Sequence, residues 1–127
     1  MILPSELEAK TTIPLIRSIL ARRLIEDHGF TQQQVAKALG ITQAAVSNYI
    51  RGARGHGCAV LGFENDKRFT DMIDGVISAI LTGEGEIEVS RRISECLLWL
   101  RRSKSLCDYH KQLEPTLDVE RCTVCDV

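Results

Sequence analysis

Three residues at fixed intervals restrict the fold of this 127-residue chain more than any other feature. Ala36 is small, Gly40 follows it by four residues, and Val46 follows Gly40 by six. Two short helices that cross closely need a small residue at the crossing, a turn residue that accepts a positive φ, and an apolar residue that fills the gap between them. The spacing therefore predicts a helix, a tight glycine turn and a second helix.

The residues around this pattern indicate where helices begin and end. Thr31 and Gln34 have the spacing of a capping box, and Thr42 is placed to cap the second helix of the pair. Upstream, apolar residues recur at three- and four-residue steps as far as Leu24. We therefore expect one helix that starts within Thr11–Pro14 and closes at Gly29, a second that ends at about Leu39, and a third that ends at Arg51.

Residues 32–52 resemble the helix-turn-helix of the lambda-repressor and Cro-like regulators, often called the XRE family. The resemblance extends from about Ile13 to Gly55. Together with Leu3–Glu6 and Ile13–Pro14, this half of the chain also resembles short archaeal regulators that carry cysteines near the end of a variable effector segment. The resemblance implies an all-α fold, and it implies that the second helix of the motif lies in the major groove of double-stranded DNA.

Carried over residue by residue, the resemblance also implies which side chains contact DNA. Gln43 is the expected base reader, because a Gln amide can bond both N6 and N7 of adenine. Gln32 would bond a phosphate and brace Gln43, and Ala44 is small enough to admit a thymine methyl. The full expected set is Gln32, Thr42, Gln43, Ala44, Ser47, Asn48, Tyr49, Arg51 and Arg54, with the two arginines placed for phosphates.

The charge pattern agrees with a polyanionic partner. The net charge is only −1, but no acidic residue occurs from His28 to Phe63. A surface without carboxylates is what a phosphate backbone requires. Aromatic residues make up only 5% of the chain, which is too few for the stacking platforms that bind single strands. The chain has no recognisable catalytic motif, signal peptide or membrane-spanning run, so we expect a soluble, cytoplasmic protein that is not an enzyme.

Beyond Arg51 the sequence changes character. We divide the chain into a DNA-binding domain at 1–55, a Gly-rich linker at 56–66 and a helical dimerisation and effector region at 67–127. A helix is expected from Phe69 to Leu81, with an apolar arc that covers about half of its circumference. A second helix is expected over residues 86–104, after two glycines. Because that arc exceeds what one small domain needs, we expect it to form a homodimer interface with the stripe Ile93, Leu97 and Leu100, and we expect the dimer to bind a palindromic operator.

Five cysteines in such a chain favour metal ligation over disulfides. Cys122 and Cys125 have a chelating spacing, and Cys107 with His110 lies upstream. These ligands suit an iron–sulfur cluster or, alternatively, zinc, with His110 as the uncertain fourth ligand. In a continuous helix Cys96 would lie about 16 Å from Cys107, so we assign it to the core as a less suitable ligand. Cys58 receives no role.

Two functions follow from the sequence. The first is a transcriptional regulator, a repressor in its simplest form, whose cysteine cluster senses redox or iron state. The second is an adaptor or antitoxin-like module, in which the helix-turn-helix packs on a protein and zinc is structural. Specific, salt-sensitive DNA binding distinguishes the first from the second.

Overall fold

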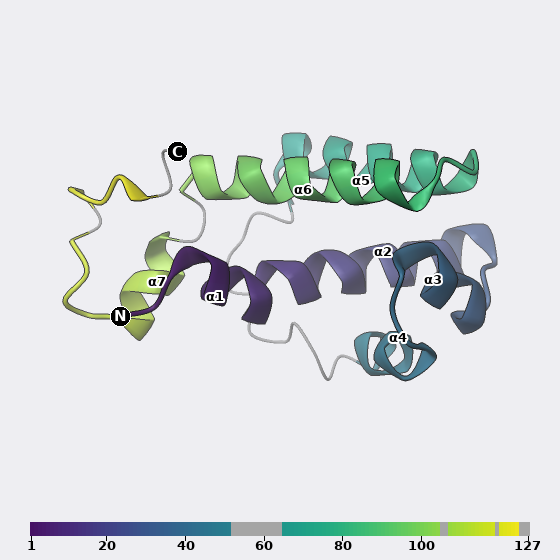
Figure 1. Cartoon of the computed structure of the whole chain (residues 1–127), viewed down its shortest axis with the longest axis horizontal. Helices are drawn as coiled ribbons and strands as arrows, with labels where there is room; N and C mark the ends of the chain where they lie inside the picture. The colour runs from purple at the N-terminus through teal and green to yellow at the C-terminus, as the bar shows by residue number, and fades with distance from the viewer. Residues whose placement is uncertain (52–64, 105–106, 119, 125–127) are drawn as a thin grey trace.

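The elements of the computed structural model are all α-helices, which confirms the predicted fold class (Figure 1). The structure describes residues 1–51, 65–104, 107–118 and 120–124. The helices are α1 (Pro4–Lys10), α2 (Thr12–His28), α3 (Gln32–Leu39), α4 (Gln43–Ile50), α5 (Lys67–Leu81), α6 (Glu86–Arg102) and α7 (Cys107–Leu113). None of the described helices is long and apolar enough to cross a membrane.

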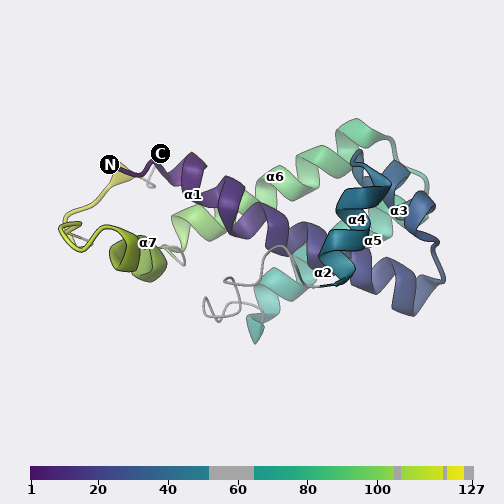
Figure 2. The same cartoon turned by 90° about the horizontal axis from the view of Figure 1, so that it is seen from below.

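The long helices form two layers. α5 and α6 are a hairpin that packs along one side of α2, and α4 lies on the opposite side of α2 (Figures 1 and 2). Gly83 has a φ of +75° in the connection between α5 and α6, a conformation that favours glycine. α3 and α4 lie at one end of the molecule, whereas α7 and the N-terminus lie at the other.

One hydrophobic core joins the helices before and after residues 52–64. It includes Leu24 of α2, Val35 of α3, Val46 of α4, Val76 of α5 and Leu100 of α6, all fully buried. Most of the expected linker at 56–66 lies outside the described residues, and the functional division of the chain stays a prediction. The helix-turn-helix pattern nevertheless shares its core with the helices that follow it.

Most of the apolar arc of α5 is covered by the chain itself, although Leu81 at its end is 46% exposed. Phe69, Ile73 and Val76 are buried against α2 and α6, and Ile77 is only 3% exposed. The arc is wide because α5 has two neighbouring helices to cover, not one. The homodimer stays a prediction, and a charge at Ile77 is now expected to unfold the chain rather than to separate two copies.

Two short helices were not predicted. α1 begins with Pro4 in its first turn, and the Glu6 side chain accepts a 3.1 Å hydrogen bond from the Leu3 N–H. It ends at Thr11, whose hydroxyl donates to the Leu7 carbonyl at 2.6 Å. α7 is equally short, at seven residues. Neither helix spans enough turns to show a period in the sequence.

Candidate nucleic-acid interface

Side-chain caps define the start of α3 and of α4, as the sequence predicts. The Thr31 hydroxyl accepts from the Gln34 N–H at 3.1 Å, and the Gln34 side chain accepts from the Thr31 N–H at 2.8 Å. The Thr42 hydroxyl accepts from the Ala45 N–H at 3.0 Å. Gly40 between them has a φ of +65°. These contacts fix the turn and therefore the direction in which α4 leaves it.

Buried side chains hold α4 against α2 and α3. Val46 is fully buried and Ala36 nearly so, as close crossing of two helices requires. From α2, the Ser18 hydroxyl donates to the Tyr49 carbonyl at 3.4 Å, and Arg22 Nη2 donates to the Ile50 carbonyl at 3.5 Å. The last turn of α4 is therefore tied to α2, which leaves its first turn facing solvent.

The first turn of α4 carries the predicted base readers. Thr42, Gln43 and Ala44 are exposed, and Ser47 and Asn48 one turn later are half-buried. This turn lies on the side of α2 away from α5 and α6 (Figures 1 and 2). Neither α3 nor α4 contains an acidic residue. The exposed turn can thus approach a polyanion without a carboxylate of its own.

Residues 20–55 match a family model described as helix-turn-helix. The chain carries a helix-turn-helix. The matched segment contains the end of α2, all of α3 and α4, and the glycine turn between them, so the comparison and the geometry identify the same element. They support a DNA-binding regulator of the XRE type. No curated protein and no solved structure matches the chain.

Not every predicted contact residue lies on the open face of the helix-turn-helix. Tyr49 is 1% exposed, and a side chain so covered cannot reach DNA, so its assignment as a contact was wrong. Its position on α4 turns it toward α2 together with Val46, three residues earlier. Gln32 is half-buried at the start of α3. It remains a candidate for a phosphate contact.

The arginines near the end of α4 add positive charge. Arg51 is exposed, and its Nη2 donates to Asn48 Oδ1 at 2.7 Å. Arg54 lies outside the described residues. Arg22 was missed: it is exposed on α2 and reaches the end of α4 through the Ile50 carbonyl. Its place off the apolar stripe of the first helix indicated exposure, but only the packing of α2 on α4 brings it to this surface.

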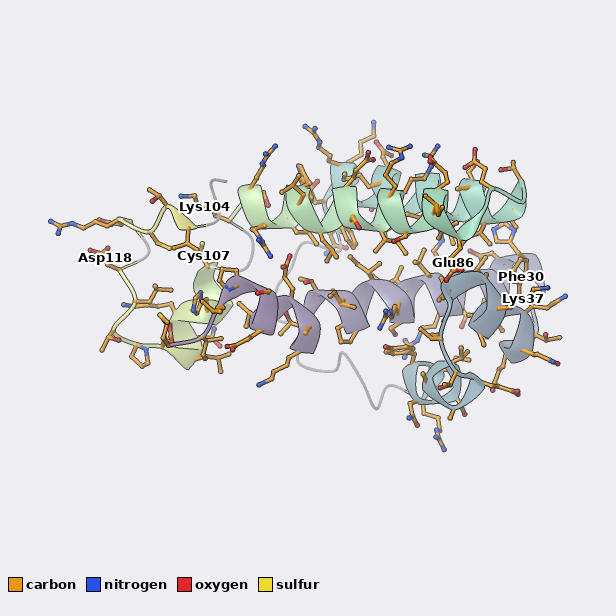
Figure 3. The ribbon with its side chains drawn as sticks, viewed as in Figure 1. Phe30, Lys37, Glu86, Lys104, Cys107 and Asp118 are labelled. Carbon is orange, nitrogen blue, oxygen red and sulfur yellow. The ribbon has the colours of Figure 1, made fainter. Side chains whose placement is uncertain are left out.

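Cys107, one of the predicted metal ligands, lies at the far end of the molecule from α4 (Figures 1 and 3). Cys107, His110 and Cys122 line one cavity of about 170 Å³, whose other walls come largely from the first seven residues. His110 Nε2 lies 3.0 Å from Glu114 Oε2, and Glu114 lines the same cavity. Cys125 lies outside the described residues. Within the described part of the chain, no three Cys, His, Asp or Glu side chains are grouped closely enough to hold a metal ion.

Cys96 is separate from these ligands. It is fully buried in the shared core, and burial raises the pKa of its thiol to about 12. A metal ligand must be a thiolate, and burial disfavours the charged form. The structure therefore agrees with a core position for Cys96.

Proposed function

We propose that the chain is a sequence-specific transcriptional regulator that inserts the first turn of α4 into the major groove. The observation that carries this proposal is the exposure of Thr42, Gln43 and Ala44 on a helix whose opposite side is fixed by Val46. A rigid scaffold with a polar, acid-free end is what direct readout of base edges requires. A small protein of this kind acts most simply as a repressor, by occupying a promoter.

The proposed binding unit is a homodimer on a palindromic operator. One helix-turn-helix reads a few base pairs, and two copies reach half-sites about 34 Å apart on one face of the duplex. Sedimentation at micromolar concentration tests this part. A dimer supports it, whereas a monomer that remains monomeric on operator DNA contradicts it.

Selection of bound sequences from random double-stranded DNA tests the proposal as a whole. We expect enrichment of a short two-fold symmetric sequence, and an affinity for it that falls steeply with added salt because phosphate contacts release counterions. Recovery of unselected sequences, with the chain loaded or free of metal, would contradict DNA readout. That result would favour the adaptor function.

We further propose that Cys107, Cys122 and Cys125 bind an iron–sulfur cluster, or alternatively zinc, with His110 as the candidate fourth ligand, and that the site senses redox or iron state. Support comes from the cavity that Cys107, His110 and Cys122 share. Bound metal would supply folding free energy to a segment whose own helix, α7, is only seven residues long.

Anaerobic purification followed by iron, sulfide and zinc analysis tests this site. Cys122→Ser should abolish metal binding, while Cys58→Ser, at a cysteine with no assigned role, should leave it unchanged. Operator affinity should then differ between the loaded and the metal-free protein. Equal operator affinity for the two would contradict a sensing role and leave only a structural one.

A further inference from the structure

A groove of about 290 Å³ lies between α2, the end of α3 and α6. Its walls combine apolar side chains, among them Ile13, Leu39, Ile93 and Leu97, with the polar residues Ser90 and Ser94. It also reaches Gly40, the turn of the helix-turn-helix. Small-molecule pockets run from about 300 to 1,000 Å³, so the groove is suited to a ligand at the small end of that range.

Two opposite charges line this groove. Arg17 of α2 is half-buried, and Glu86, the first residue of α6, is exposed. Within the described residues neither side chain forms an ion pair or a hydrogen bond, whereas Arg91 and Arg92 of α6 are both paired with Glu88. Removing a cation from water beside apolar walls is costly unless a counter-charge compensates it. The groove therefore presents one half-buried cation, Arg17, and one solvent-exposed anion, Glu86.

Glu86 lies where α6 meets the helix-turn-helix. Its Oε1 is 2.7 Å from the position that a Cβ on Gly40 would occupy, so the carboxylate lies directly over the turn. Figure 3 shows Glu86 at the same end of the molecule as Phe30 and Lys37, and far from Cys107. The groove is thus separate from the cysteine-lined cavity.

We propose that this groove binds a small zwitterion with an apolar side chain, that is, an apolar α-amino acid. A simple anion would pair with Arg17 but be repelled by Glu86. A simple cation would pair with Glu86 but be repelled by Arg17. A neutral apolar molecule would leave the half-buried Arg17 without a counter-charge. An apolar α-amino acid complements the cation, the anion and the apolar wall of the groove. Its α-carboxylate would lie at Arg17, its α-ammonium at Glu86, and its side chain against Ile93 and Leu97.

Titration calorimetry with the full chain and no DNA tests the proposal, independently of any regulatory function. The probes are L-leucine, L-valine and L-phenylalanine, together with N-acetyl-leucine, which lacks the ammonium, and leucine amide, which lacks the carboxylate. We expect at least one free amino acid to bind, and its two blocked forms to bind about tenfold more weakly or worse, because each loses a charge-assisted hydrogen bond.

Paired variants assign the two charges. Arg17→Gln and Glu86→Gln should each weaken amino-acid binding by about tenfold. Arg68→Gln on α5 and Glu26→Gln on α2, both exposed and outside the groove, should have no effect. Circular dichroism checks that each variant is folded.

Three results would overturn the proposal. The first is a wild-type chain that binds none of the free amino acids. The second is N-acetyl-leucine or leucine amide binding as tightly as leucine, which would indicate a site for a single charge. The third is a sedimentation coefficient that changes in Arg17→Gln, which would indicate that a second copy of the chain fills the groove.

Discussion

Gly40 and Gly29 form a matched pair that tests the backbone at the helix-turn-helix. Both adopt the left-handed conformation, with φ of +65° at Gly40 and +69° at Gly29. A Cβ added at Gly29 meets nothing within 4 Å, whereas one at Gly40 lies 2.7 Å from Glu86 Oε1. Alanine at Gly29 therefore introduces backbone strain alone, and alanine at Gly40 introduces the same strain and a contact.

The expected magnitudes follow from these two environments. The left-handed conformation costs an alanine about 1–2 kcal/mol, and the smaller entropy of the unfolded chain offsets up to about 1 kcal/mol. Glu86 is exposed, so its carboxylate can turn away from a new methyl group at a cost of about 0.5 kcal/mol. We expect Gly29→Ala to lower the free energy of unfolding by about 1 kcal/mol, and Gly40→Ala by about 1.5 kcal/mol.

Urea denaturation of both variants, each with and without Glu86→Ala, measures these terms. Removal of the Glu86 carboxylate should abolish the difference in unfolding free energy between the two glycine variants. The loss of stability from backbone strain, which both variants share, should remain. A Gly40→Ala protein as stable as the wild type would refute the positive φ at the turn. A Gly40→Ala variant that loses more than about 3 kcal/mol of unfolding free energy, with no recovery in Glu86→Ala, would refute the assumption that the Glu86 carboxylate can turn away from the new methyl group.

Further predictions concern the core and the cysteines. Leu100→Ala should cost about 2–5 kcal/mol in urea denaturation because Leu100 is fully buried, while Leu98→Ala, at a 41% exposed side chain on the same helix, should cost about 0.5 kcal/mol or less. Ile77→Asp should abolish the helical circular dichroism signal rather than yield a folded monomer, and a folded variant would restore the interface argument. Alkylation of the metal-free protein at pH 8, followed by mass spectrometry, should modify Cys122 long before Cys96, whose burial raises its thiol pKa to about 12; equal rates would contradict that burial.

The helix-turn-helix could be predicted because its positions each have a local requirement. Thr31 and Gln34 can cap one another only at a helix start, and a glycine followed by a Thr cap marks a turn. Tyr49 could not be placed, because its side of α4 depends on the angle at which α4 crosses α2. For the same reason the sequence could not show that most of the apolar arc of α5 is buried. That burial depends on α2 and α6 both packing on α5.

The groove lay beyond sequence reasoning for a related reason. Arg17 and Glu86 come from helices far apart in the chain, and each alone is typical of a solvated helix surface. Only the contact of α6 with α2 and α3 brings them to one hollow. Cys107, His110 and Cys122 line one cavity, with His110 one turn after Cys107 on α7, but their role as metal ligands stays a prediction.

The specificity of Gln43 tests the central claim most directly. The measurement is the ratio of affinities for the selected operator and for a scrambled duplex, by fluorescence anisotropy, in the wild type, in Gln43→Ala and in Gln33→Ala, a control at an exposed glutamine of α3. We expect Gln43→Ala to reduce this ratio by the equivalent of about 1–3 kcal/mol while leaving the scrambled duplex unaffected, and Gln33→Ala to preserve it. An unchanged ratio in Gln43→Ala would contradict the assignment of α4 as the helix that reads DNA.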